Sequence, residues 1–223
     1  MKKRTVALLL ACVMALGVAI GGTMAWLTAK TPEVKNVFTT SDISIELKEH
    51  ELNAEGTGLT DKVTTTGNNN YKMIPGWTIP KDPWVTVEAG SEACYLFVKV
   101  TENLGAWSNN KVEDRDPVFK DYLDYSVITT GDKKWTPVDG MTDVYYIVIG
   151  NKTIAATDYP ILVSNQIAVS GRVTKEMMNE VTYDDDKPTL TFQAAAVQYY
   201  ETNGHAFTVK EAFAKTPFAP ANP

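Results

Sequence analysis

Hydrophobic and polar residues alternate with a period of two along several stretches of the chain. In residues 41–48, Ile43, Ile45 and Leu47 share one face and polar residues occupy the other, which indicates a half-buried strand. Stretches rich in β-branched and aromatic residues predict further strands, at residues 84–87, 94–102, 122–129, 144–149, 161–169 and 189–200. Short polar turns, many with glycine, separate most of them. We therefore predict an all-β protein, an antiparallel jelly-roll-like β-sandwich.

Three stretches interrupt this alternation. Residues 49–70 are polar and long, and we expect an exposed excursion there rather than a hairpin. Residues 103–121 are similar, with a helical turn expected over 117–122. One short C-terminal helix is predicted from a common apolar face formed by Val209, Ala212 and Phe213. No repeat or linker is visible in the sequence, so we expect one sandwich domain over residues 40–216 and a flexible tail over residues 217–223.

The amino terminus has the pattern of an export signal. Three cationic residues follow Met1, and residues 5–22 form an apolar run before small residues, so we predict that a signal peptidase cuts between Ala25 and Trp26 and removes residues 1–25. One alternative is a retained anchor, because the run approaches the roughly 20 residues that span a membrane. Another is lipidation at Cys12, although apolar residues continue after this cysteine.

Charge and cysteine content narrow the classes of function. The 223 residues contain 21 Lys plus Arg and 27 Asp plus Glu, and loss of Lys2, Lys3 and Arg4 with the signal takes the net charge from −6 to −9. An acidic chain argues against nucleic-acid binding, which needs a clustered basic field. With Cys12 in the signal, only Cys94 remains, which excludes a disulfide within one mature chain. We expect Cys94 to be a buried, small hydrophobic residue.

No recognised motif for catalysis is complete. His50-Glu51 begins like a zinc-protease helix, but Ala54 stands where the second histidine belongs, so we expect no catalytic, cofactor or metal site. Acidic clusters at 113–116 and 184–186 could bind a hard cation, yet their spacing favours solvated loop charge. Four tryptophans would form a carbohydrate platform if exposed, but such residues more often close a sandwich core. They are Trp77, Trp84, Trp107 and Trp135.

The segment after the predicted cut, residues 26–39, is a candidate assembly arm. It mixes apolar and polar residues ahead of the first regular strand, so it is either a flexible leader, an edge strand of its own domain, or a strand donated to a neighbouring molecule. A donated strand would make a head-to-tail contact that does not close, which generates filaments. The apolar side chains that would fill a neighbour's grooves are Trp26, Leu27, Val34, Val37 and Phe38.

Two stretches near the amino terminus have a familiar pattern, Gly-Gly-Thr-Met-Ala-Trp-Leu-Thr at 21–28 and Asn-Val-Phe-Thr-Thr-Ser-Asp-Ile-Ser-Ile at 36–45. They resemble the start of the TasA/camelysin (CalY) family of secreted proteins from Gram-positive, spore-forming bacteria, where a SipW-type signal peptidase cuts. Met-Ile-Pro-Gly-Trp at 73–77 looks like a family turn. Thr-Phe-Gln-Ala-Ala-Ala-Val-Gln at 191–198 with residues 209–213 looks like the family's closing strand and helix. The resemblance covers nearly the whole chain.

This resemblance implies a subunit that assembles into extracellular biofilm-matrix fibres by donating Trp26 to about Phe38 to the next subunit. The chain departs from the family at Trp26-Leu27, which replaces the usual Ala-Phe or Tyr-Phe pair, and Pro32 would interrupt ladder hydrogen bonds in a donated strand. We therefore expect a secreted, non-enzymatic structural protein of the matrix or cell surface of a Gram-positive-type bacterium. Its partners would be copies of itself or a related subunit, and the membrane would be met only during export. The alternatives are a camelysin-like surface metalloprotease, for which the chain offers no recognisable zinc-ligand set, and a monomeric glycan-binding adhesin.

Overall fold

The computed structural model describes residues 42–65 and 71–219, which belong to one compact unit. Most regular structure is antiparallel β, with two short helices, so the all-β sandwich is confirmed. The predicted signal, cleavage site and assembly arm lie outside the described residues. The strands are β1 (Ile45–Leu52), β2 (Leu59–Thr64), β3 (Thr78–Pro80), β4 (Trp84–Val87), β5 (Cys94–Asn103), β6 (Leu123–Asp124), β7 (Thr136–Pro137), β8 (Val144–Ile149), β9 (Thr157–Pro160), β10 (Gln166–Val169) and β11 (Thr189–Gln198). The helices are α2 (Lys175–Glu180) and α3 (Val209–Phe213), and four 3-10 turns are η1 (Gly105–Asn109), η2 (Phe119–Asp121), η3 (Val163–Asn165) and η4 (Asp184–Asp186).

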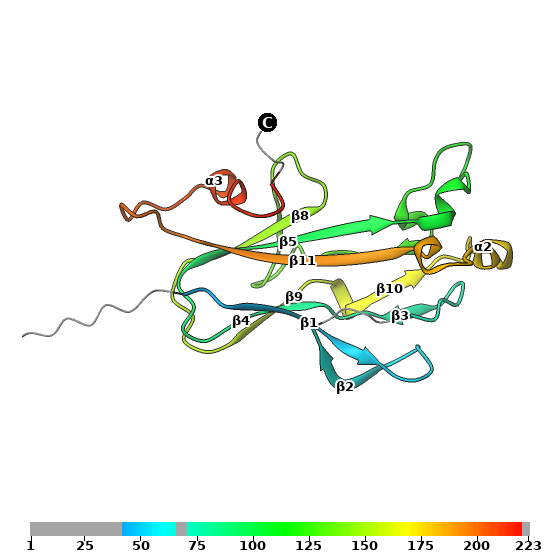
Figure 1. The fold of residues 1–223 in the computed structure, drawn as a ribbon, viewed down its shortest axis with the longest axis horizontal. Helices are drawn as coiled ribbons and strands as arrows, with labels where there is room; N and C mark the ends of the chain where they lie inside the picture. The colour runs from blue at the N-terminus through cyan, green and yellow to red at the C-terminus, as the bar shows by residue number, and fades with distance from the viewer. Residues whose placement is uncertain (1–41, 66–70, 220–223) are drawn as a thin grey trace, which may run out of the picture. The chain divides into compact units, whose positions relative to one another are not determined.

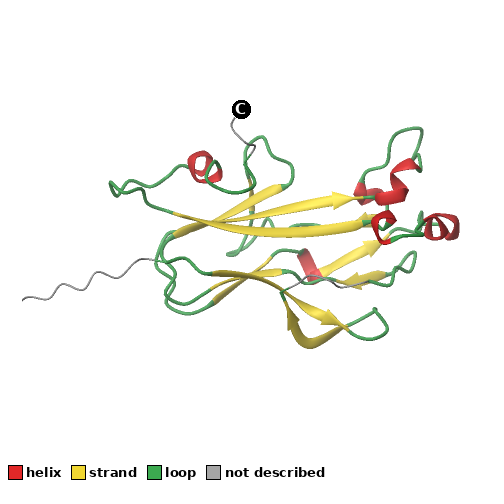
Figure 2. Ribbon diagram, viewed as in Figure 1, coloured by secondary structure: helices red, strands yellow, loops and turns green. Residues whose placement is uncertain are grey.

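The strands form two layers (Figures 1 and 2). One layer is a continuous sheet in the order β11-β5-β8-β7. The opposite layer consists of two smaller sheets, in the orders β2-β1-β4-β9 and β3-β10-β6. Apolar side chains from both layers meet between them, because alternate residues of each strand point to the same face.

The longest strands, β5 and β11, are neighbours in the continuous sheet. They pair without interruption from Thr189 opposite Asn103 to Gln198 opposite Cys94. The first half of β5 is buried on both faces, because the sandwich core covers Leu96 and α3 covers Phe97. A central strand covered on both sides explains why this segment reads as an unbroken apolar run.

Helix α3 closes a second apolar cluster on the outer face of this sheet. Thr208 caps the helix, since its side chain accepts from the Glu211 N–H while its own N–H donates to the Glu211 carboxylate at 2.8 Å. The Phe213 ring lies 6.1 Å from that of Phe97, and Ala212 is fully buried. The predicted short helix and its apolar face are confirmed. At the start of the predicted tail, the described Phe218 packs against this cluster.

The predicted strands differ in how well their bounds agree with the strands of the structure. The strands at 84–87 and 144–149 have the predicted bounds, and β5 and β11 match to within two residues. The expectation of an excursion over 49–70 is wrong, because β1 continues to Leu52 and pairs with β2 in a hairpin. Half of the residues of β2 are exposed and none is buried, so its pairing depends on main-chain hydrogen bonds and leaves no apolar signal in the sequence.

Two other predicted strands are shorter than expected. Of residues 122–129, only Leu123–Asp124 is a strand, with an isolated bridge between Val127 and Leu162. The segment 161–169 is interrupted where Ser164 adopts a φ of 56°. Helix α2, which was not predicted, begins where the Thr174 side chain accepts from the Met177 N–H.

An open strand edge beside an apolar cleft

Strand β11 is at the edge of its sheet, and among the described residues only β5 pairs with it. The N–H of Tyr199 donates to the Ala93 carbonyl at 2.8 Å, which fixes which backbone groups face β5. Because main-chain groups alternate along a strand, those of Leu190, Phe192 and Ala194 point away from β5. We call this side of β11 the open flank.

The open flank differs from every other sheet edge of the described domain. Natural proteins protect exposed edges with proline or charged residues, which discourage pairing with another chain. Each of the other edge strands carries such a residue, whereas the sequence Thr-Leu-Thr-Phe-Gln-Ala-Ala-Ala-Val-Gln of β11 has none. The protecting residues are Asp61 and Lys62 in β2, Pro80 in β3, Asp124 in β6, Pro137 in β7 and Asp158 and Pro160 in β9.

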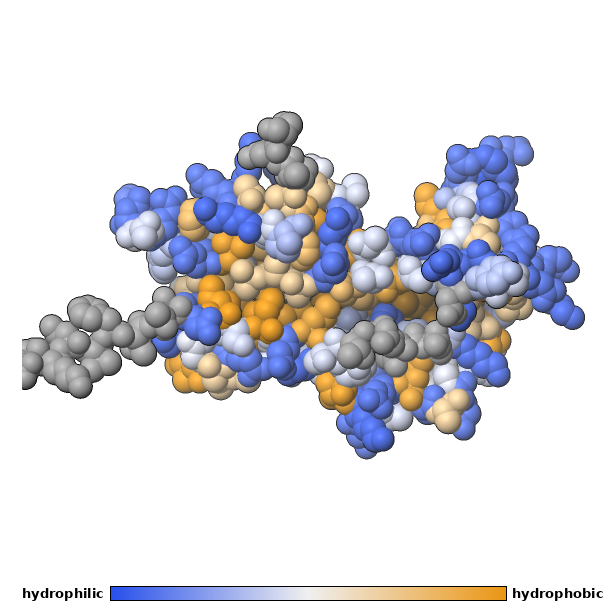
Figure 3. All heavy atoms as spheres, viewed as in Figure 1, coloured by the Kyte–Doolittle hydropathy of each residue, from blue (hydrophilic) through white to orange (hydrophobic). Residues whose placement is uncertain are grey.

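A cleft follows the first half of β11. Its narrow part, of about 190 Å³, lies between β1 and β11, with Leu47 on one side and Phe192 on the other. Its wide part, of about 550 Å³, is lined mainly by apolar side chains. Lys81, Leu190 and Thr191 line both parts, so the two adjoin. The wide part includes Tyr71, Met73, Ile79, Trp107, Phe119, Leu123, Ile167, Met178 and Val181. Figure 3 shows hydrophobic surface gathered along the seam between the layers.

A buried ion pair separates the two parts of the cleft. Lys81 Nζ lies 2.5 Å from Glu49 Oε2, with side chains only 9% and 6% exposed. The same Nζ lies 5.0 Å from the ring centre of Tyr71 and 5.6 Å from that of Phe192. Because the carboxylate neutralises the ammonium group and aromatic faces surround it, the floor of the cleft suits an apolar segment with polar backbone groups.

The candidate histidines do not assemble into a reactive site. His50 Nδ1 lies 2.6 Å from Asp82 Oδ2, and its ring stands 5.0 Å from that of Trp84. His205 is exposed on a separate turn, where its backbone N–H donates to the side-chain oxygen of Asn203. In residues 42–65 and 71–219, no group of three or more His, Cys, Asp or Glu side chains could hold a metal ion.

Two of the three carboxylates of the first acidic cluster, those of Glu113 and Asp116, form local ion pairs. Arg115 binds both carboxylate oxygens of Asp121, at 2.6 and 2.8 Å, and this hydrogen bonding lowers the pKa of that carboxyl group. Glu113 pairs with Arg172 at 2.9 Å, and Asp116 pairs with the ammonium group of Lys111. The 3-10 turn of the second cluster is held by Asp186, whose carboxylate accepts from the Tyr183 N–H at 3.0 Å.

The tryptophans and Cys94 occupy different environments. Trp107 and Trp135 are buried, and their indole N–H groups donate to the carbonyls of Met177 and Pro160. Trp77 is 62% exposed and Trp84 is half-buried, so the four tryptophans do not form a shared platform. The expectation for Cys94 is confirmed, since it is fully buried, and burial raises the pKa of its thiol to about 11.

Comparison with known proteins adds no relative. No protein-family model matches the chain, and neither does any curated protein or solved structure. Membership of the TasA/camelysin family therefore stays a prediction. In the described part of the chain, no helix has the length and apolar character needed to cross a membrane.

Proposed function

We propose that the protein is a secreted structural subunit that polymerises when residues 26–39 of one copy add a strand to the open flank of β11 in another. The observation that carries this proposal is the open flank itself, the one described edge strand without proline or charge, lying beside an apolar cleft. A matrix or cell-surface fibre is the setting that the export signal and the family resemblance support.

The length of the arm and its apolar residues suit this acceptor, and Pro32 would interrupt the ladder at one position. At about 3.3 Å per residue, residues 26–38 extend over about 43 Å and the ten residues of β11 over about 33 Å. A strand added to the open flank would satisfy the outward backbone groups of Leu190, Phe192 and Ala194. Its apolar side chains would fill the cleft, and the release of water from both surfaces would drive the association.

Truncation of the arm tests the proposal directly. A chain beginning at Trp26 and a chain beginning at Thr40 would be compared by electron microscopy and size-exclusion chromatography at mildly acidic pH. Acid reduces the self-repulsion of a chain with a net charge of −9 by protonating carboxylates. We expect filaments from the longer chain alone. Two monomeric chains would contradict polymerisation by this arm.

Blocking the open flank tests the acceptor separately from the arm. Ala194→Pro removes an N–H that points away from β5, so the ladder with β5 keeps its hydrogen bonds. Its matched control, Ala194→Ser, keeps that N–H and nearly the same volume. We expect the proline variant to fold and remain monomeric while the serine variant forms filaments. Equal assembly of both would place the acceptor elsewhere.

A further inference from the structure

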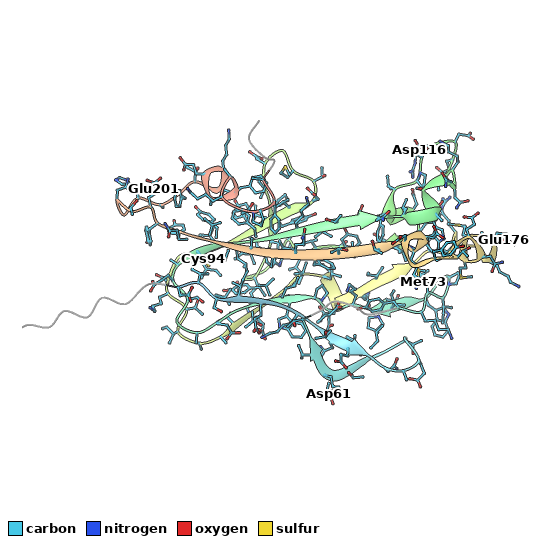
Figure 4. All side chains as sticks on the ribbon, in the orientation of Figure 1. Asp61, Met73, Cys94, Asp116, Glu176 and Glu201 are labelled. Carbon is cyan, nitrogen blue, oxygen red and sulfur yellow. The ribbon has the colours of Figure 1, made fainter. Side chains whose placement is uncertain are left out.

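The two ends of the described domain differ in what they expose. At one end lie the loops 88–93 and 150–154, which we call the exit end because the described chain begins there. At the other end the wide part of the cleft opens between β3, η2 and the start of β11, and we call this the mouth end. Figure 4 labels Cys94 near the exit end and Met73 and Glu176 at the mouth end.

We propose that, in a fibre, the exit end of one subunit packs against the mouth end of the next, with the donated arm running antiparallel to β11. This interface rests on the proposed function, because the arm brings the two ends together. It adds a body-to-body contact that the arm alone does not specify, and its partner is a second copy of this chain.

Hydrogen bonds fix the chain at the point where it leaves the domain. The N–H of Glu92 donates to the Asp42 carbonyl at 3.1 Å, and the N–H of Ser44 donates to the Ser91 hydroxyl at 3.1 Å. The neighbouring loop is tied to the same place, since Lys152 pairs with Glu92 at 2.7 Å. Asp42 therefore has a defined position at the exit end.

The connection between Asp42 and the arm is short. Only Thr39, Thr40 and Ser41 separate Phe38 from Asp42, and these four steps span at most about 14 Å. If Phe38 is docked in a neighbour's cleft, the exit end of the donor must lie within that distance of the docked residue. Two domains held so closely touch through their surface side chains.

The end of the neighbour that the donor contacts determines whether the assembly closes as a dimer or continues as a fibre. The Gln198 end of β11 adjoins the exit end, because Gln198 pairs with Cys94 and Glu92 binds Asp42. Docking of Phe38 there would join two exit ends in a reciprocal contact, which closes as a dimer. A fibre requires Phe38 at the Thr189 end, where the cleft is wide. The arm then runs antiparallel to β11, as all strand pairs of the domain do.

Exposed apolar side chains are present at both ends. At the exit end, Ile154 is 94% exposed and Tyr200 is 49% exposed. Toward the mouth end, Val118 and Tyr183 are 55% and 74% exposed, and in sequence they lie within two residues of the cleft residues Phe119 and Val181. Large apolar groups left in water at both ends become stabilising when the two ends meet.

Cysteine labelling measures this contact without disturbing it. Ile154→Cys, at a position that is 94% exposed, would be compared with Val63→Cys on β2, which is 47% exposed, each against its own labelling rate before assembly, using a maleimide reagent. The native Cys94 is fully buried and gives little background. On assembly of the chain that begins at Trp26, we expect the labelling rate at position 154 to fall at least about tenfold, because reactivity requires access, and the rate at position 63 to stay unchanged.

The outcomes separate this interface from the proposed function. Filaments in which position 154 labels as fast as it does in the unassembled chain would overturn the interface and leave strand donation intact. Failure of the chain that begins at Trp26 to form filaments would overturn both. As a second readout, Ile154→Asp should raise the concentration needed for filaments at least about tenfold relative to Val63→Asp, because an unpaired carboxylate would be buried. Equal thresholds for the two aspartate variants would contradict the contact.

Discussion

Two edge strands of the domain, β2 and β11, meet solvent in opposite ways. Strand β2 has six residues, three of them exposed and none buried, and carries Asp61 and Lys62, so a pairing chain would have to accommodate both charges. Strand β11 has ten residues, faces an apolar cleft with its inner side chains, and carries no charge. The difference shows that edge protection is applied selectively in this domain. The unprotected edge is the one that serves as acceptor in the proposed assembly.

The comparison is sharpest within β11, where adjacent residues face opposite flanks. Ala195→Pro removes an N–H that faces β5, and we expect it to lower the free energy of unfolding by about 3 kcal/mol or more. Ala194→Pro, on the open flank, should cost much less. Chemical denaturation of both variants measures the difference. Similar losses would mean that the assignment of the two flanks is incorrect.

The buried pair beneath the cleft gives a second, slightly smaller effect. Lys81→Met removes the ammonium group that lies 2.5 Å from the Glu49 carboxylate, whose side chain is only 6% exposed, and we expect it to cost about 3 kcal/mol. Lys81→Met with Glu49→Gln removes the charge and keeps an acceptor for the Tyr71 hydroxyl. The double variant should regain most of the stability in the same denaturation experiment. If it is as unstable as the single variant, packing rather than charge determines the loss.

Removing the protection of β2 is expected to have the smallest effect on stability. Asp61→Thr with Lys62→Thr changes exposed residues, so the free energy of unfolding should move by no more than about 0.5 kcal/mol. The edge would, however, resemble that of β11, and we expect self-association of a chain that begins at Thr40. Light scattering against the unsubstituted short chain measures it. Scattering that stays at the level of that chain would show that charge does not protect β2.

The sequence predicts those parts of the fold in which side-chain pattern and burial agree. The segments 84–87 and 144–149 match because their apolar residues, except Val148, are half or fully buried in a sheet. Strand β2 escapes prediction because main-chain pairing leaves no apolar pattern. The break at Ser164 depends on a left-handed backbone, which its residue type does not announce.

The candidate site is less predictable than the fold, because it depends on strand order. The strand ending at Gln198 is expected from its own composition, but a single sequence does not reveal that β5 covers one flank only. The absence of proline and charge over 189–198 is visible in the sequence and is a usable signal. It gains meaning only once β11 is known to be an edge.

The uninterrupted register between β5 and β11 has a mechanical consequence. In an antiparallel ladder the hydrogen bonds lie perpendicular to the strands. Tension applied along β11 by a strand on its open flank would load all ten residue pairs from Thr189 to Gln198 in shear, rather than peeling them apart one at a time. The geometry that leaves one flank free thus gives the other flank the arrangement best suited to carry a pulling force.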